Sequence, residues 1–325
     1  MDLPLLRHLQ FIKKLEDDPA NEFKTGRIDL KSFTPRFSRV IVVDQRVDQT
    51  RFKHSIGDLK FGDLPPGSLY NVKPSKMRFI FHSLSWALKF ISYTSQMESM
   101  LQGWTVILRE GLYINGLGSQ DENLFAMFAK GQPVEIVGLN EVRLLLLHDL
   151  ACTFYLNRVN LIMRNVRVYD FRANSSFFNS VLPVWDTECQ LFDVKMYVPR
   201  SMGPVVTGEG CALKMLRCTV NGVGFGAHEG GIIRAENCLF TSSANFPGIQ
   251  IAKRGEFHAL HVRFQRRAQI SVTFKGTCFL KACHFAANLD ADSDTDSESQ
   301  PPLFVRSEGS LDCRRSTFHS DSKPL

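Results

Sequence analysis

The chain has 325 residues, of which 44% are hydrophobic and 22% charged, a balance typical of a globular protein. Its net charge of +6 is mildly basic. No stretch approaches the roughly 18 consecutive apolar residues that span a bilayer, so the composition excludes both a disordered chain and a membrane-spanning helix.

Residues 1–75 are predicted to form a mixed N-terminal segment with a short amphipathic helix. One broad helical face collects five apolar residues: Leu5, Leu9, Phe11, Ile12 and Leu15. The run from Val40 to Val43 predicts a strand. The first fifteen residues lack the uninterrupted apolar core of a signal peptide, so we expect a cytoplasmic protein, with the nucleus as the alternative.

The next elements are typical of the start of a right-handed parallel β-helix. The run from Ser83 to Leu88 begins a helix, with Ser83 or Ser85 as the N-cap. The run from Gly103 to Tyr113 then gives a strand, a glycine turn and an aromatic residue. We expect the helix to cover the open end of the coil, where unpaired strand edges would otherwise invite aggregation.

A three-residue pattern recurs through the second half of the chain. Each triplet is small or β-branched at its first position and, in most copies, large and apolar at its third. The third positions are Val168, Met196, Val220, Phe240, Phe264, Phe285 and Phe318. A glycine usually precedes the triplet by several residues, and a period in the low twenties fits one coil of stacked short strands.

These patterns together predict an all-β protein, a right-handed single-stranded parallel β-helix of the pectin-lyase-like kind with a helical N-terminal cap. The solenoid is expected over residues 76–325. Residues 288–302 interrupt the last period with alternating acidic and hydroxyl residues, which predicts a disordered loop. Ser293 and Thr295 there have the acidic spacing that acidophilic kinases favour, and a merely solubilising loop is the alternative.

The cysteines are predicted to fill core positions in a reducing compartment. Six of them fall on or near repeat positions: Cys211, Cys218, Cys238, Cys278, Cys283 and Cys313. Their spacing does not pair as in metal sites. A zinc site made by His258, His261, Cys283 and His284 is the alternative to ordinary ladder and surface residues, and we expect no cofactor.

The carbohydrate enzymes that share this architecture need clustered acids. Within the coils the polygalacturonase motifs are missing, and the nearest sequence is Gly226-Ala227-His228. We therefore expect no catalytic activity. A basic strip, expected to contact acidic partners, is formed by Lys253, Arg254, Arg263, Arg266 and Arg267. Nucleic acid is not the expected partner, because strand alternation turns Phe264 inward while Arg263 faces outward.

The cap sequences and repeats such as Asn237-Cys238-Leu239-Phe240 resemble the Shc SH2-domain-binding protein family, which includes nessun dorma. That resemblance implies a cytokinesis adaptor that binds the centralspindlin kinesin complex at the midbody or spindle, and a solenoid face that can bind carbohydrate. The architecture also resembles adenoviral β-helix proteins. We therefore expect a non-catalytic scaffold that binds protein partners on one face; the alternatives are a carbohydrate-binding or divergent carbohydrate-active protein, and a viral partner-binding or capsid protein.

Overall fold

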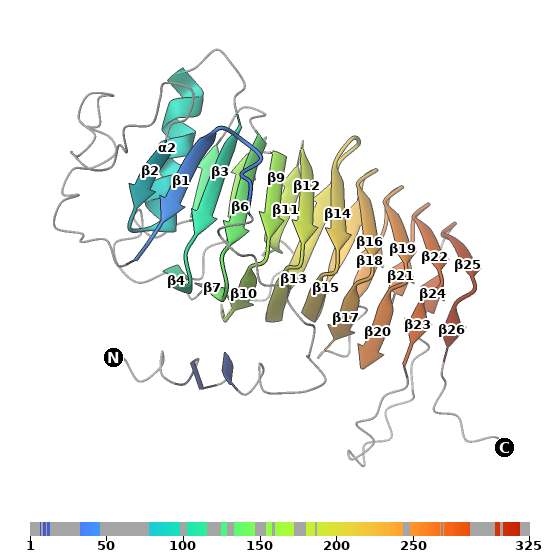
Figure 1. Ribbon diagram of the computed structural model, residues 1–325. Coiled ribbons are helices and arrows are strands. Elements are labelled where there is room, and N and C mark those ends of the chain that lie inside the picture. The colour runs from blue at the N-terminus through green and yellow to red at the C-terminus, as the bar shows by residue number, and fades with distance from the viewer. Residues whose placement is uncertain are drawn as a thin grey trace.

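The chain forms a right-handed parallel β-helix, seen from the side as a rod of stacked strands in Figure 1. The computed structural model describes residues 7, 9–10, 12–13, 33–45, 78–97, 103–115, 125–128, 133–146, 154–157, 160–171, 180–185, 187–242, 248–266, 268, 270–286, 303–305 and 308–318. The loop predicted at 288–302, its Ser293 and Thr295, and Arg267 lie outside these residues.

One face of the rod is an 11-stranded parallel sheet. In spatial order its strands are β2 (Arg78–Phe81), β1 (Arg39–Val43), β3 (Trp104–Leu108), β6 (Pro133–Gly138), β9 (Asn160–Arg164), β12 (Glu188–Phe192), β14 (Ala212–Leu216), β16 (Ile232–Glu236), β19 (Glu256–Leu260), β22 (Thr277–Lys281) and β25 (Ser310–Arg314). Side chains on each strand alternate between the core and the outer surface of this face.

A second sheet of 15 strands forms the rest of the rod wall. Its main path contains β4 (Gly111–Asn115), β7 (Val142–Leu146), β10 (Arg167–Asp170), β13 (Lys195–Thr207), β15 (Thr219–His228), β17 (Leu239–Ser242), β20 (Arg263–Arg266), β23 (His284–Phe285) and β26 (Thr317–Phe318). A side branch, joined through β13 and β15, contains β5 (Phe125–Phe128), β8 (Phe154–Asn157), β11 (Ser180–Trp185), β18 (Ile249–Ile251), β21 (Ile270–Val272) and β24 (Leu303–Val305).

The predicted ladder of repeat positions is confirmed along the main path of the second sheet. Val168, Met196, Val220, Phe240, Phe264, Phe285 and Phe318 are paired in unbroken succession from β10 to β26. The rings of Phe264 and Phe285 are stacked with centroids 4.3 Å apart. Apolar burial of this kind, repeated from coil to coil, is the main stabilising contribution to a solenoid.

The helical cap is also confirmed. Helix α2 (Leu84–Met97) follows Ser83, whose carbonyl accepts the first helical hydrogen bond from Ala87 N–H at 3.2 Å. Leu88 and Ile91 of α2 are buried in the same core cluster as Trp104 of β3. The helix therefore closes the core at the N-terminal end of the rod (Figure 1).

Two parts of the N-terminal segment, residues 1–75, contact the side of the solenoid. Strand β1, predicted from Val40–Val43, lies between β2 and β3 and so belongs to the 11-stranded sheet rather than to a separate unit. The described residues of the predicted amphipathic helix, 7, 9–10 and 12–13, are helical. Ile12 is buried beside Leu145, Tyr169 and Tyr197, on the outer side of the second sheet.

Candidate functional site

At the corner after each strand from β6 to β25 of the 11-stranded sheet, one residue adopts the left-handed backbone conformation. The corner residues have φ between 52° and 59°, and they are Asn140, Asn165, Asp193, Arg217, Asn237, His261, Ala282 and Arg315. Asparagine and aspartate tolerate this left-handed conformation, whereas other side chains resist it. Where coils follow one another, the corner N–H donates to the next coil, as from His261 to the Lys281 carbonyl at 3.0 Å.

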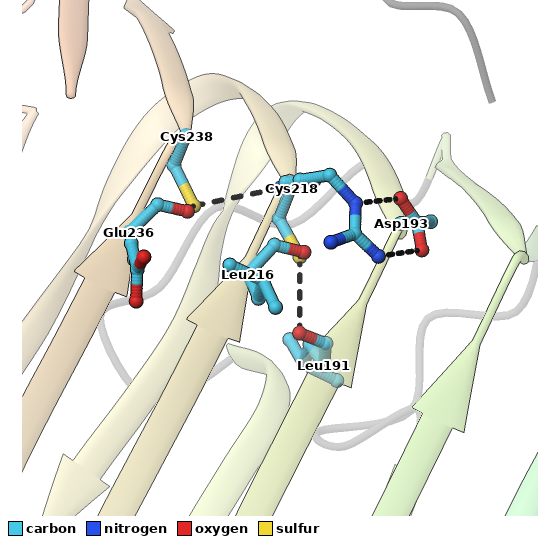
Figure 2. A network of polar contacts seen from close by, with 7 residues as sticks. Leu191, Asp193, Leu216, Cys218, Glu236 and Cys238 are labelled. Atoms are coloured by element: carbon cyan, nitrogen blue, oxygen red, sulfur yellow. Dashed lines mark hydrogen bonds and ion pairs between the residues drawn. The ribbon is translucent and has the colours of Figure 1, made fainter. Parts of the chain in front are cut away.

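The residue after the corner turns inward from Val166 to Cys283, and cysteine suits this tight position in three of those coils (Figure 2 shows two of them). The Cys218 thiol donates to the Leu191 carbonyl at 3.4 Å, and Cys218 N–H donates to Sγ of Cys238 at the same distance. Burial, together with the contact with Cys238, raises the pKa of Cys218. Burial also raises the pKa of Cys189 to about 12, so these thiols stay protonated and unreactive.

The prediction that the repeat cysteines are buried holds for five of the six and is wrong for Cys313, which is exposed. Cys313 occupies an inward position of β25, directly after Leu280 of β22 in register. Since β25 is the last strand of its sheet, no further described strand covers that side chain.

The predicted basic strip is divided between two corners of the coil. Lys253 and Arg254 lie in the glycine-containing turn before β19, whereas Arg263 begins β20, after β19. The five residues of β19, about 17 Å of extended chain, separate the two groups. Arg266 ends β20.

Acidic residues accompany the first of these groups. Lys253 Nζ lies 3.0 Å from Glu229 and Arg254 lies 3.8 Å from Glu209, both in the corresponding turns of earlier coils. The corresponding turn of the next coil packs closely against this one: a β-carbon on Gly276 would come within 2.6 Å of the Ile251 carbonyl oxygen, so glycine is needed there. This corner therefore pairs its cations with carboxylates of the same chain.

The outer surface of the 11-stranded sheet is covered at its N-terminal end by residues 33–38, a segment of the same chain without regular secondary structure. Phe37 N–H donates to the Thr105 hydroxyl of β3 at 3.1 Å, and Arg36 N–H donates to the Glu135 carboxylate of β6, also at 3.1 Å. Arg164 of β9 holds the other oxygen of Glu135 at 2.9 Å. Phe37 and Arg36 thus contact the neighbouring strands β3 and β6, and the segment crosses the strands of the sheet (Figure 1).

Further along the rod the same surface is open and hollowed into a groove of about 550 Å³, here called the lateral groove. A single outward column crosses it in register, formed by Lys214, Arg234, His258, Phe279 and Asp312. The His258 ring stacks on Phe279 with centroids 4.6 Å apart, and Glu256 holds His258 at 2.9 Å. Phe279 is 38% exposed, so the groove has an aromatic floor.

The charges of the lateral groove are mainly positive. Four cations line it, Lys214, Arg234, Lys281 and Arg314, against two carboxylates, Glu236 and Asp312, which leaves a net charge of +2. Asp312 is held by Arg314 at 2.8 Å. Lys214, Arg234 and Lys281 form no ion pair with any described residue, so three cations are available to a ligand.

A second hollow of about 510 Å³, here called the corner pocket, lies beyond the edge of the lateral groove. It is lined by Arg217, Asn237, Cys238, His261, Val262, Arg263, Ala282 and His284. Leu260 and Lys281 of the groove are followed directly by His261 and Ala282 of the pocket. The two hollows therefore meet at the left-handed corner.

The described residues give no sign of a metal centre: no three His, Cys, Asp or Glu side chains among them are grouped to hold an ion. The three histidines of the alternative zinc site lie apart: His258 lines the groove, whereas His261 and His284 line the pocket.

In the described part of the chain, no helix has the length and apolarity to cross a membrane. Comparisons with protein-family models, curated proteins and solved structures find no match to this chain.

The lateral groove was missed in the sequence, although a signal for it exists. Lys214, Arg234, His258 and Phe279 each stand six residues before a ladder position, namely Val220, Phe240, Phe264 and Phe285. In β22 the exposed Phe279 occupies the place that carries a charged or polar side chain in the three preceding coils. The exposed ring of Phe279 thus interrupts a column that is otherwise charged or polar, and this break is the signal for the groove in the sequence.

Proposed function

We propose that this protein is a non-catalytic scaffold whose lateral groove binds an extended, acidic segment of a protein partner. The observation that carries this proposal is the row of unpaired cations around the exposed Phe279 ring. A rigid solenoid face loses little conformational entropy when it binds an extended chain, which favours such a role.

The chain's own residues 33–38 support the proposed binding mode. They already lie across the same outer column, held by backbone N–H groups that donate to outward side chains. The groove covers the five strands from β14 to β25, and four spacings of about 4.8 Å give about 19 Å, the length of roughly six extended residues.

The spacing of the carboxylates supports a non-catalytic role. Hydrolysis of a glycosidic bond uses two carboxyl groups roughly 5 to 9.5 Å apart. Glu236 lies on β16 and Asp312 on β25, which are three strand spacings, about 14 Å, apart. Asp312 is also engaged by Arg314.

The resemblance to the Shc SH2-domain-binding family makes the centralspindlin complex the first partner to test, in the cytoplasm or at the midbody of dividing cells. Carbohydrate binding is the second candidate function. It is favoured by the stacked His258 and Phe279 rings, because sugars pack on aromatic faces while cations hold acidic groups.

The test uses isothermal titration calorimetry to compare three anionic probes of six units each: hexaglutamate, a hexamer of galacturonic acid, and hexathymidylate. We expect hexaglutamate to bind, and the double variant Lys214→Gln/Arg234→Gln to weaken its affinity about fivefold or more. The matched control Lys253→Gln/Arg254→Gln removes the same charge from the far corner and is expected to change affinity by less than about twofold.

Three outcomes would overturn the proposal. If the control pair weakens binding and the groove pair does not, the basic strip predicted from the sequence is the site. If the galacturonate hexamer binds and hexaglutamate does not, the groove is a carbohydrate site. Stronger binding of hexathymidylate with a steep salt dependence would instead identify a nucleic-acid surface.

A further inference from the structure

We propose that the corner pocket binds the phosphate group of a phosphorylated serine or threonine on the partner segment that occupies the lateral groove. This inference rests on the proposed function and adds to it a chemical requirement on the partner. It is carried by the side chains that four neighbouring coils bring together at the left-handed corner.

The pocket is lined by nitrogen donors and by no carboxylate. Arg217, Arg263, His261, His284 and the Asn237 amide all contribute to its wall. A phosphate monoester carries close to two negative charges and three acceptor oxygens, and a set of two guanidinium groups with neighbouring donors suits it. A carboxylate offers two oxygens and one charge, so it would leave part of this set unused.

Arg217 is held in place for such a ligand. Its Nε and Nη2 donate to the two oxygens of Asp193, each at 2.7 Å, while the side chain remains 51% exposed. The Nη1 amino group is not used by this ion pair, so it stays available to an anion. Because Asp193 fixes the fork, little side-chain entropy is lost when a ligand binds.

The other donors come from later coils. Arg263 is exposed at the start of β20 and forms no ion pair with a described residue. His284 of β23 is oriented by a hydrogen bond between Nδ1 and the Thr317 hydroxyl at 2.9 Å. His261 is an exposed residue of the left-handed corner.

The position of the pocket favours a phosphopeptide over a nucleic acid. A nucleic-acid backbone carries a phosphodiester at every nucleotide and needs a continuous basic track. Beside the pocket the cations of the groove are interrupted by the aromatic floor and by the carboxylates Glu236 and Asp312, so they do not form a continuous track. One concentrated pocket next to a peptide-sized groove matches a single phosphorylated residue within an acidic segment.

The experiment uses hexaglutamate in which one glutamate at a time is replaced by serine or by phosphoserine. At a position beside the pocket, we expect the phosphoserine peptide to bind about tenfold tighter than the serine peptide, because charge-assisted hydrogen bonds to phosphate are strong. Unsubstituted hexaglutamate should recover only a small part of the gain. Arg263→Gln should remove the gain, and it should weaken binding of the serine peptide by no more than about twofold.

Arg315→Gln is the matched control, since Arg315 is an exposed corner residue outside the pocket. It should keep the phosphoserine gain. The proposal is overturned if phosphoserine gives no gain at any position, or if Arg315→Gln removes the gain as Arg263→Gln does. It is also overturned if hexathymidylate displaces the bound phosphopeptide more effectively than an excess of the same unlabelled phosphopeptide does.

If no peptide binds at all, the proposed function has failed, and the pocket is tested separately by titrating free phosphoserine into the full chain. The side-chain Nε–Hε resonances of Arg217 and Arg263 should then shift in NMR spectra, and Arg315 should not. Unmoved resonances of both pocket arginines would overturn the phosphate site on its own.

Discussion

The aromatic side chains divide into two groups according to the side of the strand on which they lie. Phe264 faces inward and is almost fully buried between Phe240 and Phe285. Phe279 faces outward, where the His258 ring stacks on it. The same residue type therefore stabilises the fold at one position and lines the proposed binding groove at the other.

Replacing each ring by alanine separates these roles. Phe264→Ala should lower the free energy of unfolding by about 3 to 5 kcal/mol, because it leaves a cavity in the ladder. Phe279→Ala should lower it by less than about 1 kcal/mol, since no core contact is lost. Urea denaturation followed by circular dichroism measures both, and equal losses would contradict the assignment of faces.

The thiols give a second measurement at the residue scale. Cys313 is exposed, whereas Cys189, Cys218 and Cys278 are buried and burial raises the pKa of each. In the native protein at pH 8, iodoacetamide should modify Cys313 first among the described cysteines, with the buried ones reacting only after denaturation. Mass spectrometry of the modified peptides locates each label. Early labelling of Cys218 would show that the corner is not packed as described.

The repeating unit of this fold is a strand, a left-handed corner and a second strand. Its corner residue is under different constraints in different coils. In Asn165 the side-chain amide donates to the carbonyls of Gly138 and Asn140 at 2.8 and 3.2 Å, so the side chain supports the turn. Ala282 has the same backbone conformation, with φ of 53°, and no polar side chain to support it.

Substitutions at these two corners should have opposite effects. Asn165→Ala removes two hydrogen bonds and leaves buried carbonyls without a partner, and should lower the free energy of unfolding by about 2 to 3 kcal/mol. Ala282→Gly relieves the steric cost of the left-handed backbone and should raise the free energy of unfolding by up to about 1 kcal/mol. Thermal and urea denaturation measure the two changes; a large loss for Ala282→Gly would refute the strain argument.

The elements could be predicted because each inward position is a local property of the sequence. The spacing of Val220, Phe240 and Phe264 predicted the register of neighbouring coils, and the cap helix followed from its N-terminal serine and its position before the strand and glycine turn of residues 103–113. The groove was harder to predict, since it depends on outward residues from strands that are 20 or more residues apart. Arg234, His258 and Phe279 become neighbours only when the inward ladder is used to align them.

Clusters of charge in the sequence were a poor guide to clusters on the surface. Lys253, Arg254 and Arg263 are close in sequence but lie at opposite ends of β19. Arg217 and Arg263 are distant in sequence and line one pocket. In a solenoid the neighbours of a surface residue come from the adjacent coils, so periodic distance matters more than distance along the chain.

At the scale of the whole molecule, the rod is covered unevenly. Helix α2 closes the core at one end, residues 33–38 cover the outer surface of β3 and β6, and Ile12 packs on the second sheet. The open part of the 11-stranded face is the lateral groove, between β14 and β25. The central claim is therefore that this stretch of the rod, and not the Lys253 corner, receives the partner.

Photo-cross-linking tests this claim most directly, because two exposed phenylalanines of one coil give a matched pair. Benzoylphenylalanine replaces Phe279 in the groove or Phe274, which is 64% exposed in the turn before β22. With hexaglutamate present, irradiation should cross-link the peptide at position 279 and not at position 274. Cross-linking at 274 alone, or equally at both positions, would contradict binding in the lateral groove.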